Sequence, residues 1–160
     1  MRSFTRRVAS IVTPILAAVA LGACGGGTGA PAKAAYAREV NAAQSKFALT
    51  VSDASQASEQ GDRSLKRQQR LLQRFHAAIE DVVRDLRNID APSEVSKEHG
   101  KLVSVMSSYG EEIGRADEAM RNPTPLGFQQ AKQRVGIASR SVSAQVNAAI
   151  AAINVKLRGD

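Results

Sequence analysis

Apolar residues recur every three or four positions through most of this chain, and that spacing constrains the fold more than any other feature. A single apolar stripe with this spacing is typical of amphipathic helices that share a core. In the stretch 62–89 the stripe is Leu72, Phe75, Ile79, Val82, Leu86 and Ile89. In the stretch 92–121 it is Val95, His99, Leu102, Met106, Tyr109, Ile113, Ala116 and Met120.

The first and last stretches carry the same spacing with smaller side chains. In 33–60 the stripe is Tyr36, Val40, Ala43, Phe47, Val51 and Ala54. In 124–157 it is Phe128, Ala131, Val135, Ala138, Val142, Val146, Ala149, Ile153 and Leu157. Because these side chains are small, we expect the first and last helices to approach their neighbours closely.

Three breaks separate the stretches. Gly61-Asp62 and the run Asp90 to Ser93 are the first two, and Asn122 to Pro125 is the third, with Thr124 as N-cap and Pro125 in the first turn. The segments 33–60, 62–89, 92–121 and 124–157 would each be about 42 to 51 Å long. Similar lengths and short loops predict an all-α, up-down-up-down antiparallel four-helix bundle over residues 33–160. A three-helix or swapped dimeric arrangement is the alternative.

The N-terminal segment has the organisation of an export signal. Arg2, Arg6 and Arg7 precede an apolar run, 8–23, that contains no ionisable residue and is too short for a comfortable membrane span. The run ends in Leu21-Gly22-Ala23-Cys24, where small residues precede the only cysteine of the chain. The alternatives are an ordinary secretory signal with a chance cysteine, or an uncleaved helix; the Arg6-Arg7 pair fits a twin-arginine signal poorly.

Leu21, Gly22, Ala23 and Cys24 resemble the lipobox of bacterial lipoproteins. The resemblance implies a signal peptide, 1–23, cleaved before Cys24, a diacylglyceryl thioether on Cys24, and fatty acylation such as palmitate at the new terminus. Residues 24–32 would then be the lipidated cysteine and a flexible glycine-rich tether. We therefore expect a membrane partner through Cys24 and a location on the outer face of the bacterial cell membrane, or on an outer membrane if one exists.

Few residues in the sequence suggest catalysis. Once Cys24 is lipidated no thiol remains for a disulfide or a metal, and His76 and His99 are the only histidines. Neither lies in a motif for nucleophilic catalysis, zinc, di-iron or covalent haem. We therefore predict a protein that is not an enzyme and has no catalytic residue, no metal site and no cofactor.

The most conspicuous charge feature is a basic stripe at helical spacing, made up of Arg63, Lys66, Arg67, Arg70 and Arg74. It could attract an anionic envelope polymer or lipid headgroup. The alternative is a solvated face neutralised by Glu111, Glu112, Asp117 and Glu118 of the following helix, and charge runs on helices are usually of that kind. The net charge of +7 includes three leader arginines, so the mature chain is only mildly basic, and no nucleic acid partner is expected.

Two further features allow a ligand. His99 occupies a position within an apolar stripe, where it would be either a ligand or a histidine satisfied by a hydrogen bond near its helix start; the second reading is the commoner one. The aromatic residues could line a cavity for an apolar small molecule or haem, although such residues more often fill a core.

The mature region as a whole resembles small lipoproteins of actinobacterial type, from high-GC Gram-positive bacteria, with a tether and a helical bundle. The resemblance rests on the run Tyr36 to Asn41 and on the run Ala91 to Val95 together with His99 and Leu102. It implies no activity. The sequence therefore predicts a lipid-anchored, non-enzymatic cell-envelope protein that serves as an interaction or structural module. A bundle that binds an apolar molecule or haem is the alternative.

Overall fold

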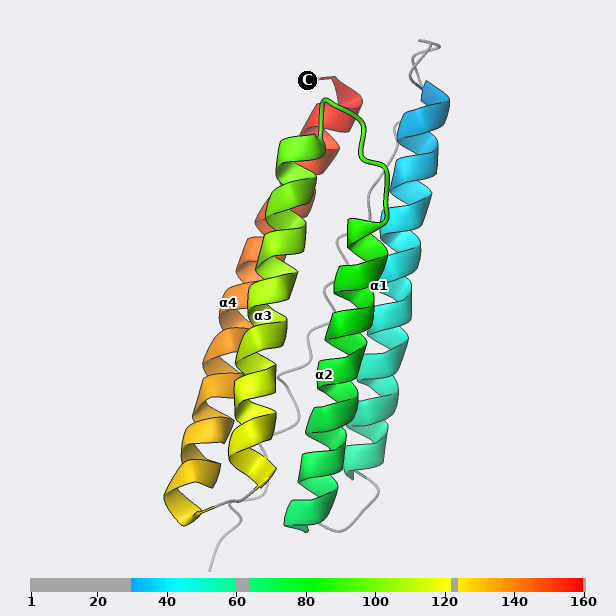
Figure 1. Cartoon of the computed structure of the whole chain (residues 1–160). Helices are drawn as coiled ribbons and strands as arrows, with labels where there is room; N and C mark the ends of the chain where they lie inside the picture. Colours follow the sequence, from blue (N-terminus) through cyan, green and yellow to red (C-terminus); the bar gives the residue numbers. More distant parts are fainter. Residues whose placement is uncertain (1–29, 60–63, 122–123, 160) are drawn as a thin grey trace, which may run out of the picture.

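The computed structural model describes residues 30–59, 64–121 and 124–159, and their regular structure is helical. The helices are α1 (Ala30–Glu59), α2 (Leu65–Arg87), α3 (Ser96–Arg121) and α4 (Pro125–Arg158). Consecutive helices run antiparallel and pack on one another (Figure 1), which confirms the up-down-up-down bundle. One end of the bundle, here called the near end, contains the start of α1, residues 88–95 and the end of α4. The opposite end is called the far end.

Local signals set the two ends of α4, and the first of them is the one that the sequence predicts. Thr124 is the N-cap, and its side-chain oxygen accepts a hydrogen bond from the Gly127 amide at 3.0 Å, with Pro125 in the first turn. At the other end Gly159 adopts a φ of 80°, a left-handed conformation that a residue with a side chain rarely adopts. The helix therefore ends at Arg158, one residue beyond the predicted segment 124–157.

Helix α1 begins at Ala30, before the expected start at residue 33, so residues 30–32 of the predicted tether belong to this helix. Two other helices begin later than the sequence predicts. The helix expected from residue 62 begins at Leu65, after Ser64 as N-cap, and the helix expected from residue 92 begins at Ser96. Pro92 opens a turn instead, because the Val95 amide bonds to its carbonyl at 3.0 Å. Gly61 and Asp62, the expected first break, lie outside the described residues.

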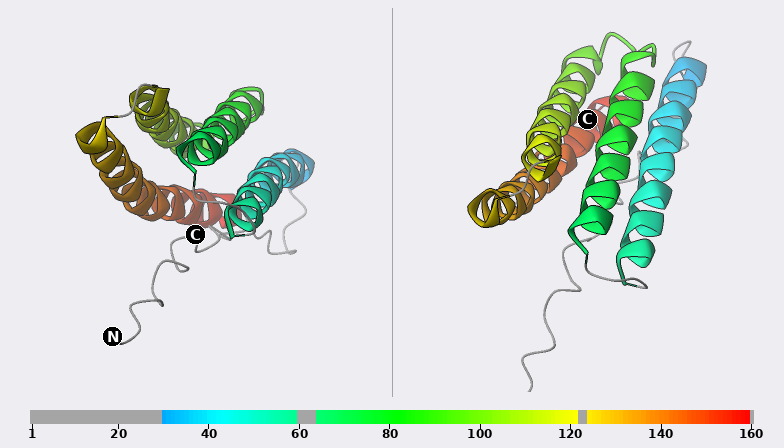
Figure 2. Two further views of the ribbon diagram at one scale, coloured as in Figure 1. Left: turned by 90° about the horizontal axis from the view of Figure 1, so that it is seen from below. Right: turned by 60° about the horizontal axis from the view of Figure 1, so that its bottom comes forward.

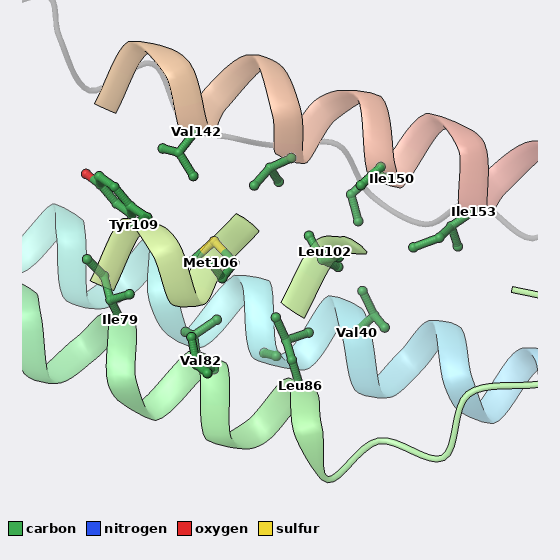
Figure 3. Close-up of a cluster of buried hydrophobic side chains, with 14 of the residues drawn as sticks. Val40, Ile79, Val82, Leu86, Leu102, Met106, Tyr109, Val142, Ile150 and Ile153 are labelled. Carbon is green, nitrogen blue, oxygen red and sulfur yellow. The ribbon is translucent and has the colours of Figure 1, made fainter. Parts of the chain in front are cut away.

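The predicted stripe of α3 is buried at every position, with Val95, Ile113 and Ala116 fully excluded from solvent. Figure 3 shows Leu102, Met106 and Tyr109 between the side chains of α2 and those of α4. Sequence analysis did not assign several other buried residues to the core: Ala37, Ala78, Val83, Gly110, Asp117 and Ile150. The core is therefore built around α3, which packs on both α2 and α4.

The α1–α2 and α3–α4 hairpins spread apart toward the far end (Figures 1 and 2). Burial follows this divergence. Tyr36, Val40 and Ile153 are buried completely or almost completely near the near end, whereas Phe47 and Leu72 are only partly buried. In α1 and α2 the far half of the predicted stripe is therefore less completely covered than the near half, whereas the stripe of α3 is buried throughout.

Close approach of helices occurs where the sequence analysis did not expect it. A Cβ atom added at Gly114 of α3 would lie 3.0 Å from His76 Nε2 of α2, and one at Gly110 would lie 3.3 Å from Ile79 Cγ2. Such distances leave little room for a side chain. Gly110 and Gly114 therefore set how closely α3 packs on α2.

The packing predicts unequal effects of one substitution at two leucines. Leu86→Ala removes a side chain that is 2% exposed, so we expect the free energy of unfolding to fall by about 2–5 kcal/mol. Leu49→Ala is the matched control, because Leu49 is 67% exposed and its loss should cost less than about 0.5 kcal/mol. Chemical denaturation measures both, and equal effects would contradict the assigned core.

Candidate functional site

The basic stripe lies on the outward side of α2, opposite the buried residues Ile79, Val82 and Leu86 of the same helix. Lys66, Arg70 and Arg74 are exposed and Arg67 is partly buried, whereas Arg63 lies outside the described residues. The spacing of four between residues 66, 70 and 74 places these side chains on one face. Four of the five predicted residues therefore lie together, in the half of α2 that reaches the far end.

The acids expected to neutralise the stripe are paired within their own helix. Arg115 binds Glu111 at 3.2 Å and Glu112 at 2.7 Å, and Arg121 binds Glu118 at 3.2 Å. Arg121 also pairs with the buried Asp117 at 3.4 Å. These pairs have the i, i+3 and i, i+4 spacing of neighbours on a helix surface, so the acids have partners closer than α2.

Three cations of the basic stripe have no acidic side chain as an ion-pair partner among the described residues. Lys66, Arg70 and Arg74 form no ion pair with any side chain that the structure describes. The stripe therefore presents positive charge to solvent at the far half of α2, in a setting where an anionic molecule could approach it.

The surface of the described residues has open depressions between neighbouring helices. One of 320 Å³ lies between α1 and α2 and is lined by Thr50, Asp53, Arg74, Ala77, Ala78 and Asp81. Another, of 180 Å³, lies between α3 and α4, where Ser108, Ser141 and Gln145 contribute to its lining. Both contain polar groups and open to solvent, so neither has the enclosed apolar form that retains a drug-sized apolar ligand.

His99 joins three helices at the near end. Its Nε2 donates to the Leu86 carbonyl of α2 at 3.0 Å, and its Nδ1 lies 3.2 Å from the Tyr36 hydroxyl of α1. Since a carbonyl can only accept, the proton of the neutral ring is on Nε2, and Nδ1 accepts from Tyr36. His99 is 7% exposed, so the interpretation of a histidine satisfied by a hydrogen bond is confirmed.

Burial shifts the acid–base properties of this pair. It disfavours the charged imidazolium and lowers the pKa of His99, while the hydrogen bond to Leu86 acts in the opposite direction. Burial also raises the pKa of Tyr36 to about 12. Both side chains are therefore neutral at pH 7, and each ring nitrogen of His99 already has a hydrogen-bond partner within the protein.

A second polar contact joins α3 to α4, and sequence analysis missed it. Glu98 is 7% exposed, and one of its carboxylate oxygens lies 3.1 Å from Lys156 Nζ. Burial acts to raise the pKa of Glu98, but the hydrogen bond and charge of Lys156 hold it below its ordinary value. In the sequence Glu98 looks like any acid in a first helical turn, so only the fold identifies its partner.

No metal or haem ligand set was expected, and the two histidines have separate surroundings. His76 lies against Gly114 and 3.7 Å from Glu80 of its own helix, while His99 is engaged by Leu86 and Tyr36. Among residues 30–59, 64–121 and 124–159, no group of three or more His, Cys, Asp or Glu side chains is placed to hold a metal ion.

The predicted lipidation site and lipobox, Cys24 with Leu21, Gly22 and Ala23, lie outside the described residues. None of the four described helices contains an apolar stretch sufficient to cross a bilayer. Comparisons of the chain with protein-family models, curated proteins and solved structures found no match.

His99 makes stability depend on pH in a defined direction. Because its pKa in the folded protein lies below the ordinary value of 6.5, the unfolded chain takes up a proton first as the pH falls. The contribution of neutral His99 is thus complete above pH 6.5 and is progressively lost below it. We expect the free energy of unfolding to fall between pH 7 and pH 5.

Denaturation of two glutamine variants across this pH range checks the assignment. His99→Gln should lose most of the pH dependence, because the titrating group is gone. His76→Gln, which leaves the buried network intact, should retain it. The assignment is wrong if both variants behave alike.

Proposed function

We propose that this chain is a non-enzymatic lipoprotein of the bacterial cell envelope, exported and tethered to a membrane through diacylglyceryl Cys24. Its helical bundle would serve as an interaction module for an envelope protein or an anionic envelope polymer. The observation that carries the interaction is the group of cations on α2, Lys66, Arg70 and Arg74, which have no ion pair with a described side chain.

The sequence supports the anchor. Charged residues, an apolar run and Leu21-Gly22-Ala23-Cys24 occur in the order that a lipoprotein signal requires. Two or three acyl chains hold a protein on a bilayer far longer than one, because each buried methylene contributes about 0.8 kcal/mol. The tether would then lead into α1 at the near end, which also contains residues 88–95 and the end of α4.

The position of the basic stripe supports a contact at the far end. It lies in the half of α2 that is distant from the start of α1 (Figure 1). Positive charge that is not neutralised locally raises the rate at which an anionic partner is encountered. A partner in the envelope would therefore meet the stripe on the part of the bundle farthest from the tether.

We do not propose a bundle that binds haem or an apolar molecule, because its own side chains occupy the space between the helices. The Phe47 and Phe75 rings lie 5.9 Å apart, and Phe75 meets Tyr109 edge to face at the same distance. Tyr109 belongs to the main core cluster, and Phe47 and Phe75 are partly buried and pack against it. The aromatic residues therefore fill the interior, as such residues usually do.

Metabolic labelling with a fatty-acid probe in the native bacterium tests the anchor. The natural protein should incorporate the probe and fractionate with membranes, and Cys24→Ala should do neither, because it removes the sulfur that carries the lipid. Incorporation that persists in Cys24→Ala, or a protein that stays unlabelled in the cytosol, would refute the anchor.

Charge reversal on α2 tests the interaction. Arg70→Glu with Arg74→Glu should reduce capture of the partner from envelope extracts several-fold, and added salt should reduce capture by the natural protein as well. The matched control is Lys97→Glu with Lys101→Glu, which makes the same charge change at exposed positions on the near half of α3. If the two double variants capture the partner equally well, the basic stripe is not the surface that binds it.

A further inference from the structure

Helix α4 carries a second uncharged stripe that faces away from the bundle. Its members repeat every three or four residues and are all exposed: Leu126, Gln130, Gln133, Ile137, Ser141, Ala144, Ala148, Ala151 and Val155. At 100° per residue they fall within about 40° of one line along the helix, opposite the buried residues. We call this set the outer stripe.

The outer stripe exposes large apolar side chains as well as small ones. Leu126 is 68% exposed, Ile137 is 53% exposed and Val155 is 43% exposed. Over the described part of the chain, only Leu49 and Leu65 join them as exposed large hydrophobic residues. Exposed apolar side chains that line up along one helix mark an interaction surface more strongly than scattered ones.

The charges of α4 are all of one sign. The helix contains Lys132, Arg134, Arg140, Lys156 and Arg158 and no acidic residue. Arg134 and Arg140 are exposed, lie about 60° to either side of the outer stripe, and form no ion pair with a described side chain. The face therefore combines an uncharged centre with positive margins.

This pattern fits an anionic lipid surface. Helices that lie in the plane of a membrane place apolar residues among the acyl chains, while Lys and Arg at the margins meet anionic headgroups. A second copy of the chain fits less well, because pairing two outer stripes would bring basic margins together without acids to neutralise them. Charge complementarity therefore favours lipid.

The path of the chain between Cys24 and α1 is compatible with a lipid bilayer at the outer stripe. The end of α4 and the start of α1 both lie at the near end of the bundle (Figure 1). The six residues from Cys24 to Gly29 could span roughly 20 Å at most when extended. A lipid on Cys24 would thus hold the near end of α4 within reach of the bilayer, although the outer stripe itself does not require that lipid.

We propose that the outer stripe of α4, flanked by Arg134 and Arg140, rests on the anionic surface of a lipid bilayer. The bundle would then lie along the membrane on α4. Helix α2 lies across the bundle from α4 (Figure 2), so its basic stripe would face away from the bilayer toward other envelope components. The proposal goes beyond the proposed function, because it adds a membrane contact made by the folded domain.

A fluorophore that brightens in apolar surroundings tests the contact in the full chain. Cys24→Ala removes the natural thiol, and Ala148→Cys provides one labelling site on the outer stripe. Ala77→Cys is the matched control, an exposed alanine on the outward side of α2. On phosphatidylglycerol vesicles we expect a blue shift and a several-fold rise in emission at position 148 only, and little change at either position on phosphatidylcholine vesicles.

Charge reversal separates this contact from other causes of vesicle binding. Arg134→Glu with Arg140→Glu should abolish the response at position 148, whereas Arg70→Glu with Arg74→Glu should leave it in place. Every variant lacks Cys24 and carries the same leader. The absence of a response at position 148 would therefore contradict the membrane contact of α4 without bearing on the lipid anchor.

Three results would overturn the proposal. The first is an unchanged label at position 148 on phosphatidylglycerol vesicles, and the second is an equal response at positions 77 and 148. The third is a response at position 148 that appears without vesicles as protein concentration rises, because a second copy of the chain would then cover the outer stripe.

Discussion

Burial of one face of α3 between α2 and α4 is the constraint on which the rest of this structure depends. Every position of the predicted stripe from Val95, directly before α3, to Met120 is buried, and the helix packs on neighbours on both sides. Helix α1 joins mainly by packing on α2. Apolar area removed from water is the dominant favourable term in folding, so the helix that buries most of its stripe organises the others.

Polar contacts then fix the near end. His99 links α1, α2 and α3 through Tyr36 and the Leu86 carbonyl, and Glu98 links α3 to Lys156 of α4. Buried polar groups are costly unless they are satisfied, so these contacts favour one arrangement of the helix ends. Among the described residues, the far end holds a small second core cluster of Ala116, Met120 and Ala131, and there the hairpins diverge.

Much of the fold could be predicted from the sequence, because spacing and punctuation are local properties. The stripe of α3, the cap at Thr124 and the order of the helices all follow from residues close together in the chain. The partner of Glu98 does not, since Lys156 is distant in the chain and only the fold brings it near. The ion pairs of Glu111 and Glu118 have local helical spacing, but sequence analysis paired these acids with the basic stripe of α2 instead. The outer stripe of α4 was overlooked because its alanines resemble the core positions of the same helix.

We infer that stability is concentrated in α3 and the near end, which leaves the outward faces and the far end available for contacts. Hydrogen–deuterium exchange of the full chain tests it most directly. Amides around Leu102, Met106 and Ile113 should exchange slowest, at the rate of global unfolding, and those near Leu65 and Leu126 much faster. Uniform protection along all four helices, or slowest exchange at the far end, would contradict this account.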